Sequence, residues 1–232
     1  MDRLQAFCLL IALAYFSLLT VPALIAYPPS LEVAFLDALL NTALLSTLAT
    51  SVSVPVGTVM AYGALPRSWR LTAPLVTFTV SVPHTAIGVL LAPSVFGAGL
   101  ADTAAAITLA MVVVSLPMSF SVLRGAFASL GVGYVEFLRG IGVRGLGVAL
   151  MMLRSTRTAL ISASLLTWFR CFSELGAFLI LAQRPLTVGV YVYEEFLKRG
   201  AGPVIGASLA LLAVALLVAF LLERWTEGAG SR

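Results

Sequence analysis

Long apolar stretches alternate with short polar segments along the whole chain. A helix needs about 20 apolar residues to cross a hydrocarbon core of about 30 Å. Stretches of this kind predict six membrane spans, over residues 4–26, 38–65, 71–92, 103–123, 158–182 and 204–222. They must be helices, because unpaired backbone groups in lipid cost several kcal/mol each and the sequence has no alternating barrel pattern. We therefore expect an all-α fold in which residues 1–232 form one membrane domain.

Composition agrees with this pattern. Hydrophobic residues make up 60% of the chain and charged residues only 10%, whereas soluble domains carry about 25% charged residues. The first apolar run is also longer than the roughly 7 to 15 residues of a signal peptide's apolar region. We therefore expect a multi-pass protein of the cell membrane whose first helix is retained.

Basic residues are distributed unevenly between the two predicted sides of the membrane. Short cytoplasmic loops are enriched in Lys and Arg, and one side of the predicted topology holds most of these residues, namely Arg3, Arg67, Arg70, Arg124, Arg139, Arg144, Arg154, Arg157, Arg224 and Arg232. The other side holds Arg184, Lys198 and Arg199 together with Glu32, Asp37, Asp102, Glu194 and Glu195. Both termini are thus predicted to be cytoplasmic. The net charge of +4 reflects topology and not nucleic-acid binding.

A polar segment punctuated by glycines, about residues 125–157, joins the fourth and fifth predicted spans. It predicts two short helices joined by a tight turn near Gly142, because glycine accepts the positive φ values of such a corner. One face would be apolar, with Leu138, Ile141, Leu146, Leu150 and Leu153. This face could dock into a groove of another protein or lie on anionic lipid, and the residues alone favour neither.

Glu136, Phe137, Leu138 and then Gly142 resemble the EAA loop of ABC importer permeases. In that family the loop forms coupling helices that sit in a cleft of a cytoplasmic ATPase. The resemblance implies an ATPase-coupling surface formed by Glu136, Phe137, Leu138, Gly142, Arg144 and Leu146. Two parts of the motif depart from the family pattern: its small pair is Phe137 and Leu138 here, and Arg154 and Ser155 replace its closing Leu and Pro.

Four further segments resemble the molybdate and tungstate permeases within this family. FRCFSELGAFLIL (169–181) is similar to their fifth-span signature through Arg170, Ser173, Glu174, Gly176 and Ala177. Residues 41–62, 82–91 and 115–119 resemble their second, third and fourth spans. The similarity covers roughly residues 36–182, in order and with compatible spacing.

Ionisable residues inside predicted spans are the candidate site. Arg170 and Glu174 are four residues apart and would share a helix face. Ionisable side chains at membrane depth often belong to a functional site. The favoured interpretation here is that these two neutralise each other within the bundle. His84 follows Pro83 at an expected helix kink and could bind an oxyanion or a neighbouring carbonyl. Spans three and five line the path in the family, so the resemblance implies path residues Ser81, His84, Thr85, Arg170, Glu174 and Gly176. Asn41 and Thr42 could cap a helix or form hydrogen bonds between spans, and capping is the favoured interpretation.

The sequence has no phosphate loop, HExxH pair or GxSxG elbow, so we expect a non-enzymatic subunit without a cofactor of its own. The resemblance implies the permease of an ATP-driven importer for a tetrahedral oxyanion, molybdate or tungstate, or alternatively sulfate. Its partners would be a second copy, an ATPase pair carrying ATP and Mg, an extracytoplasmic binding protein and the lipid bilayer. A secondary transporter or a membrane scaffold is a weaker alternative.

Overall fold

The computed structural model describes residues 3–27, 32–65 and 71–230, and all regular elements in these ranges are helical. In chain order they are α1 (Arg3–Ala26), α2 (Val33–Gly63), α3 (Thr72–Thr77), the 3₁₀ turn η2 (Phe78–Val80), α4 (His84–Gly97), α5 (Ala104–Gly140), α6 (Leu146–Ser155), α7 (Arg157–Phe172), α8 (Phe178–Leu181), α9 (Val188–Arg199) and α10 (Gly202–Gly230). The all-α fold class is confirmed. Arg67, Arg70 and Arg232 lie outside the described residues.

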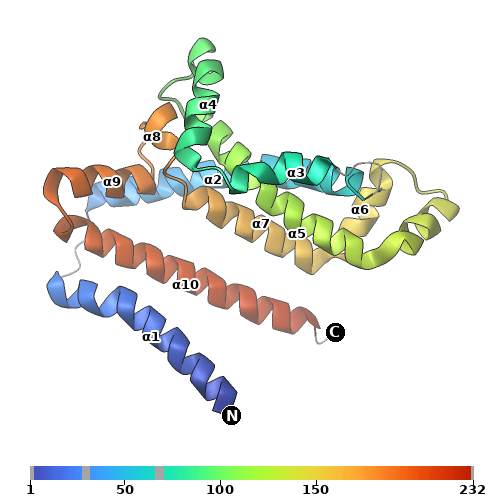
Figure 1. Cartoon of the computed structure of the whole chain (residues 1–232), viewed down its shortest axis with the longest axis horizontal. Helices are drawn as coiled ribbons and strands as arrows, with labels where there is room; N and C mark the ends of the chain where they lie inside the picture. Colours follow the sequence, from blue (N-terminus) through green and yellow to red (C-terminus); the bar gives the residue numbers. More distant parts are fainter. Residues whose placement is uncertain (1–2, 28–31, 66–70, 231–232) are drawn as a thin grey trace.

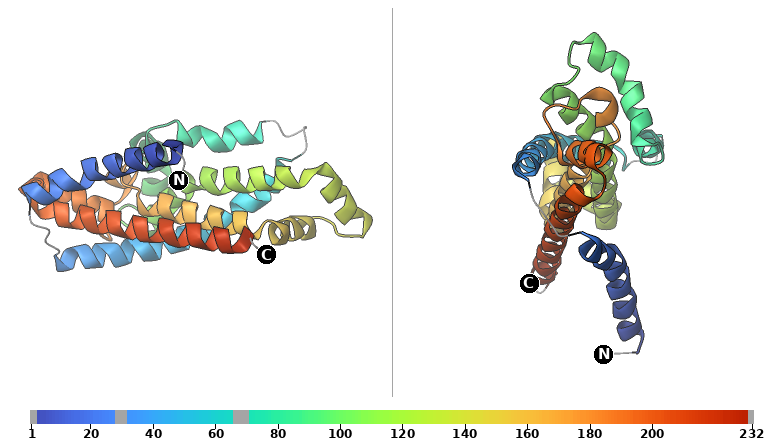
Figure 2. Two further views of the ribbon diagram at one scale, coloured as in Figure 1. Left: turned by 90° about the horizontal axis from the view of Figure 1, so that it is seen from below. Right: turned by 90° about the vertical axis from the view of Figure 1, so that its left-hand side faces the viewer.

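The centre of the bundle is formed by α2, α5 and α7, which run side by side along the long axis (Figures 1 and 2). Small polar residues let α2 and α5 approach closely, as is common between membrane helices. The Ser53 and Ser115 hydroxyls are 3.0 Å apart, and Ser119 Oγ donates to the Ser53 carbonyl at 2.9 Å. A Cβ atom at Gly57 would overlap the Ser119 side chain. Glycine and serine therefore permit the close approach of α2 and α5 at this level.

Four described helices are long and apolar enough to cross a membrane: α1, α2, α5 and residues Gly202–Phe220 of α10. A fifth span is obtained if Thr72–Val80 and His84–Gly97, which meet at a bend of 111°, are taken together. The predicted span over residues 158–182 is not one helix, because α7 ends at Phe172 and α8 contains only four residues. The expectation of six spans is therefore not confirmed, and the fifth predicted span is not one continuous helix.

The two interruptions lie against each other. Pro83, which has no backbone donor, precedes His84 at the first, and the second covers residues 173–177. A Cβ atom at Gly176 would lie 3.0 Å from His84 Cβ, and one at Gly88 would lie 3.0 Å from Ala177 Cα. Glycine at these two positions is what allows α4 to pack against the second break (Figure 1).

Helix α2 is tied to the segment before α9 through two polar residues in its third turn. Asn41 Nδ2 donates to the Leu186 carbonyl at 3.2 Å, and the Val188 amide donates to Thr42 Oγ1 at 2.8 Å. The favoured interpretation of Asn41 and Thr42 as helix caps is wrong, because α2 already begins at Val33, and the alternative of hydrogen bonds between segments holds. Both side chains instead join segments that are far apart in the sequence.

Ion pairs gather at the end of the bundle formed by α9 and the start of α2. Arg199 Nη2 lies 2.8 Å from Glu32 Oε1, and Lys198 Nζ lies 2.9 Å from Glu194 Oε2. Hydrogen bonding from Arg199 lowers the pKa of Glu32, and hydrogen bonding from Lys198 lowers the pKa of Glu194. A carboxyl group whose pKa is lowered in the folded protein stabilises the fold at pH values above its ordinary pKa. These ion pairs therefore persist at neutral pH and weaken only in acid.

Helix α1 stands apart from the other helices (Figures 1 and 2), and nearly all its described side chains are exposed, with Thr20 buried. Only 6% of an apolar 18-residue stretch within this helix is buried against the rest of the chain. Such a surface cannot remain in water, so lipid or another protein must cover it.

Candidate functional site

Three ionisable side chains meet where the two interrupted helices touch. Arg170 Nη2 lies 3.0 Å from Glu174 Oε2 and 2.6 Å from each of the two ring nitrogens of His84, while His84 Nδ1 lies 3.2 Å from the same Glu174 oxygen. Arg170 comes from the last turn of α7, Glu174 from the break after it, and His84 from the first residue of α4. We call these three residues the Arg–His–Glu triad.

Glu174 is the most enclosed member of the triad. Its residue surface is 1% exposed, whereas the side chains of Arg170 and His84 are 21% and 32% exposed. Its second oxygen, Oε1, accepts a hydrogen bond of 2.9 Å from the Ala177 amide at the start of α8. One buried carboxylate therefore joins the end of α7, the start of α8 and the start of α4.

The hydrogen-bonding capacities of the three groups complement one another. An arginine guanidinium only donates hydrogen bonds and an ionised carboxylate only accepts them. A neutral imidazole protonated at Nδ1 can donate to Glu174 and accept from Arg170 at Nε2, whereas the other tautomer can accept from Arg170 at Nδ1. With either neutral tautomer of His84 the triad has no net charge, since the positive guanidinium offsets the carboxylate.

These contacts correct two sequence expectations. Glu174 does not share a helix face with Arg170, because α7 has ended at Phe172, although the ion pair forms across the break. His84 does not bind a carbonyl of a neighbouring helix, because its hydrogen-bond partners are side chains. Of the other predicted path residues, Gly176 packs against His84 and Thr85, whereas Ser81 lies exposed in the bend and makes no side-chain contact with the triad.

The turn between α5 and α6 lies at the opposite end of the bundle from α9 (Figure 1). Gly142 has φ 91° and Gly145 has φ 55°, the left-handed region that favours glycine. The Gly142 amide donates to the Arg139 carbonyl at 3.0 Å, and the Val143 amide donates to the Leu138 carbonyl at 3.0 Å. The structure thus places a tight turn at Gly142 between two helices, as the glycine pattern predicted.

Five of the six predicted coupling residues are exposed around this turn. Phe137 is 61% and Leu146 63% exposed, and Glu136, Gly142 and Arg144 also face outward. Leu138 is different: it is 3% exposed and packs in the core with Val148 and Met152. The expectation that Leu138 belongs to the outward apolar face is wrong, because the turn folds this leucine back onto α6.

Helix α6 passes almost directly into α7. Thr156, the single residue between them, is buried, and its hydroxyl donates to the Met152 carbonyl at 2.9 Å. Ser155, which departs from the family pattern, lies 2.6 Å from the Tyr134 hydroxyl and so links α6 to the end of α5. The sequence offered no signal for this pair, because its partners lie in different helices. Because only Thr156 separates α6 from α7, these two helices form one connection from the exposed turn to Arg170.

Two cysteines, exposed Cys8 and buried Cys171, are free. Across residues 3–27, 32–65 and 71–230, no group of three His, Cys, Asp or Glu side chains is arranged to hold a metal ion.

Comparison with known proteins now adds to the geometry. The chain is 28% identical over 204 residues to the molybdate/tungstate transport system permease protein WtpB of Thermococcus kodakarensis, covering 87% of this chain and 81% of that protein. It is 26% identical to WtpB of Pyrococcus abyssi, covering 83% and 79%. A probable molybdenum ABC transporter permease of Haloferax volcanii is 27% identical, covering 84% and 77%. The chain is a relative of molybdate/tungstate permease proteins.

The resemblance inferred from the ordered sequence motifs is therefore confirmed. No family model matches the chain. The molybdate/tungstate permease relatives and the long apolar helices agree on a multi-pass membrane protein of the transport class.

Proposed function

We propose that this chain is the membrane permease subunit of an ABC importer for molybdate or tungstate. The observation that carries the proposal is the helical connection from an exposed glycine turn, through α6 and α7, to the triad that holds two broken helices together. The names of its relatives support both the transporter class and the anion.

The exposed turn is suited to bind a soluble partner and to move with it. Phe137, Ile141 and Leu146 present large apolar side chains to solvent, beside the charged Glu136 and Arg144. A helix segment with apolar anchors of this kind can seat in a groove of a partner protein. We assign that partner as a separate ATPase, with ATP and Mg bound on its subunit and not on this chain.

Movement at the turn would reach the triad through α7. This helix has 16 residues, and at 1.5 Å per residue it extends about 24 Å. Rigid displacement of α6 and α7 would shift Arg170 relative to His84, because Arg170 moves with α7 whereas His84 belongs to α4. Separation of α7 from α4 then opens the region around the triad, and its re-formation closes that region.

The triad is charge-balanced in this conformation, so it does not attract an anion as it stands. An opening that moves Arg170 away from His84, and from the Glu174 carboxylate that the Ala177 amide holds near α8, would expose a guanidinium, which forms strong charge-assisted hydrogen bonds with oxyanions. Thr85 and Ser81 lie exposed near the same bend and could add hydroxyl donors. The closed triad would thereby release an anion that the open form holds.

Reconstitution tests this function. The chain is co-purified with its ATPase, inserted into liposomes, and supplied with the solute-binding protein loaded with molybdate, tungstate or sulfate. ATP hydrolysis and anion uptake are both expected to rise with molybdate or tungstate and to stay near background with sulfate. Uptake driven by an ion gradient without ATPase would indicate a secondary transporter, and ATPase binding without any anion flux would indicate a scaffold.

A second copy of the chain and an extracytoplasmic binding protein complete the proposed importer. The exposed apolar surface of helix α1 would face lipid or this second copy. The ion-paired end at α9 would face the binding protein, and the turn at Gly142 would face the cytoplasm together with both termini.

Cysteine labelling tests this orientation. In a cysteine-free background, Glu194→Cys is expected to react with a membrane-impermeant maleimide added to intact cells, because it lies at the α9 end. Arg144→Cys at the opposite end is expected to react only after the membrane is permeabilised. The reverse accessibility of the two positions would invert the topology.

A further inference from the structure

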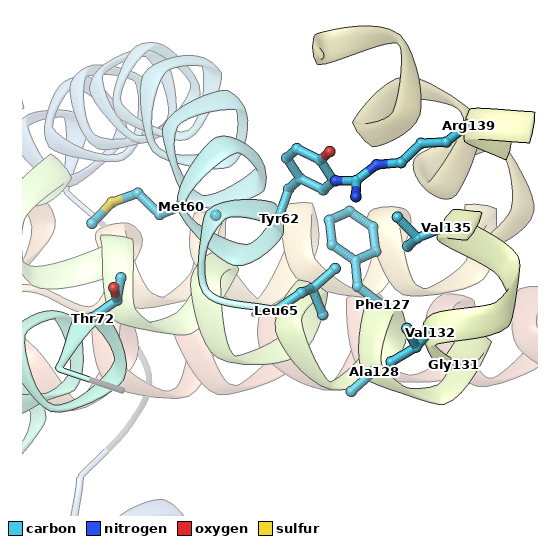
Figure 3. A pocket seen from close by; sticks show the side chains of 11 residues that line it. Met60, Tyr62, Leu65, Thr72, Phe127, Ala128, Gly131, Val132, Val135 and Arg139 are labelled. Carbon is cyan, nitrogen blue, oxygen red and sulfur yellow. The ribbon is translucent and has the colours of Figure 1, made fainter. Parts of the chain in front are cut away.

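A large groove lies between the ends of α2, α3 and α5, near the turn at Gly142 but away from the triad. Its volume is about 770 Å³, within the range of about 300 to 1,000 Å³ typical of ligand sites. Its walls are mainly apolar, with Met60 and Leu65 on one side and Phe127, Val132 and Val135 on the other (Figure 3). Phe127 is fully buried and forms part of the groove's floor.

The groove results from a bend in α5. Gly131 has φ 76° and ψ 165°, so the helix is interrupted there and its last turns leave the direction of the first part. Gly131 itself lines the groove, which lies inside the bend. The conformation favours glycine at this position, and it holds the groove walls apart.

Arg139 is the charged residue in the described lining of this apolar groove. Its side chain comes from the last turn of α5 and extends back over the groove toward Tyr62 (Figure 3). No carboxylate lies within ion-pair distance of it in the part of the chain that the structure describes. The groove thus combines a long apolar surface with one uncompensated positive charge at its edge.

We propose that this groove binds one anionic phospholipid, with its phosphate on Arg139 and an acyl chain along Met60, Phe127 and Val132. The charge complementarity is that of a guanidinium fork with phosphate oxygens. Basic pockets between membrane helices bind anionic headgroups in this way. A small hydrated oxyanion fits poorly, because the apolar walls would strip its water and the described lining residues would offer it one charged partner in return.

The expected position of the groove along the membrane normal suits a lipid. Met60 belongs to the end of α2, which is long enough to span the membrane, Leu65 follows that helix, and Arg139 lies toward the polar turn. An acyl chain would therefore reach from the helix ends into the hydrocarbon, while the phosphate stays at the level of the headgroups.

Native mass spectrometry of the detergent-purified chain tests this proposal. The protein is mixed with equal amounts of phosphatidylglycerol and phosphatidylcholine, and the retained lipids are counted. Wild type is expected to retain phosphatidylglycerol preferentially, and Arg139→Gln is expected to reduce that preference about fivefold, the contribution of one arginine near a membrane surface. Val132→Trp, which fills the groove, is expected to reduce retention of both lipids.

Arg124→Gln is the matched control. Arg124 belongs to the same helix, is exposed and makes no ion pair with a described residue, but it lies over the Phe120 ring and outside the groove. It should retain the wild-type preference. An equal loss in Arg124→Gln, or an unchanged preference in Arg139→Gln, would overturn the proposal. A dimer peak in the wild-type spectrum that disappears in Val132→Trp would also overturn the proposal, because it would mean that a second copy covers the groove. Free glycerol phosphate should not displace the bound lipid.

Discussion

Replacing Glu174 with alanine is expected to lower the free energy of unfolding by about 3 kcal/mol. Removing one partner of a buried ion pair costs about 3 to 5 kcal/mol, and the lower end applies because the Arg170 side chain keeps 21% exposure. The substitution also leaves the Ala177 amide without its acceptor at the start of α8. Thermal unfolding of the detergent-purified chain, together with the monodisperse fraction in size-exclusion chromatography, measures this loss.

Further variants separate the ion pair from the backbone contact. Glu174→Gln keeps an oxygen for the Ala177 amide but removes the negative charge, and Arg170→Gln with Glu174→Gln removes both charges, so the double variant should be more stable than Glu174→Gln alone. Glu194→Ala is the control, since its exposed ion pairs contribute only about 0 to 1 kcal/mol. Normal stability of Glu174→Ala together with altered preference between molybdate and sulfate would instead make Glu174 a path residue.

The triad shows what local sequence can and cannot predict. The spacing of Arg170 and Glu174 indicated an ion pair, and the pair is present even though the helix between them ends. His84 was a candidate because of Pro83, yet its partners lie 86 residues or more further along the chain. Helical periodicity relates only neighbours on one helix, so no pattern in the sequence could assign those partners.

The spans show a similar limit. A run of apolar residues has the same mean hydropathy whether its helix is straight or broken, so residues 71–92 and 158–182 both suggested continuous spans. Pro83 did indicate a kink, but a bend of 111° depends on the packing of Gly88 and Gly176 between two distant segments. The turn at Gly142 was predictable because its cause is local: the glycines supply the positive φ values that the turn requires.

Replacing Gly142 with valine is expected to reduce anion uptake at least about tenfold while leaving membrane insertion intact. Gly142 has φ 91°, and a β-branched residue held in such a conformation costs on the order of 1 to 3 kcal/mol. Nothing lies within 4 Å of a Cβ atom at this position, so the strain is in the backbone and not in packing. The turn should therefore rearrange, and Glu136, Phe137 and Leu146 would lose the geometry of the proposed contact with the ATPase.

Gly140→Val is the matched control, because Gly140 is two residues away at the end of α5, is equally open to solvent around its Cβ and has no positive φ. Uptake into proteoliposomes and co-purification of the ATPase are measured for both variants, with the amount of chain in the membrane as the reference. Gly140→Val should retain most of its uptake. Equal losses in the two variants would attribute the effect to added apolar bulk, and normal uptake by Gly142→Val would show that the turn does not transmit the ATPase movement to α7.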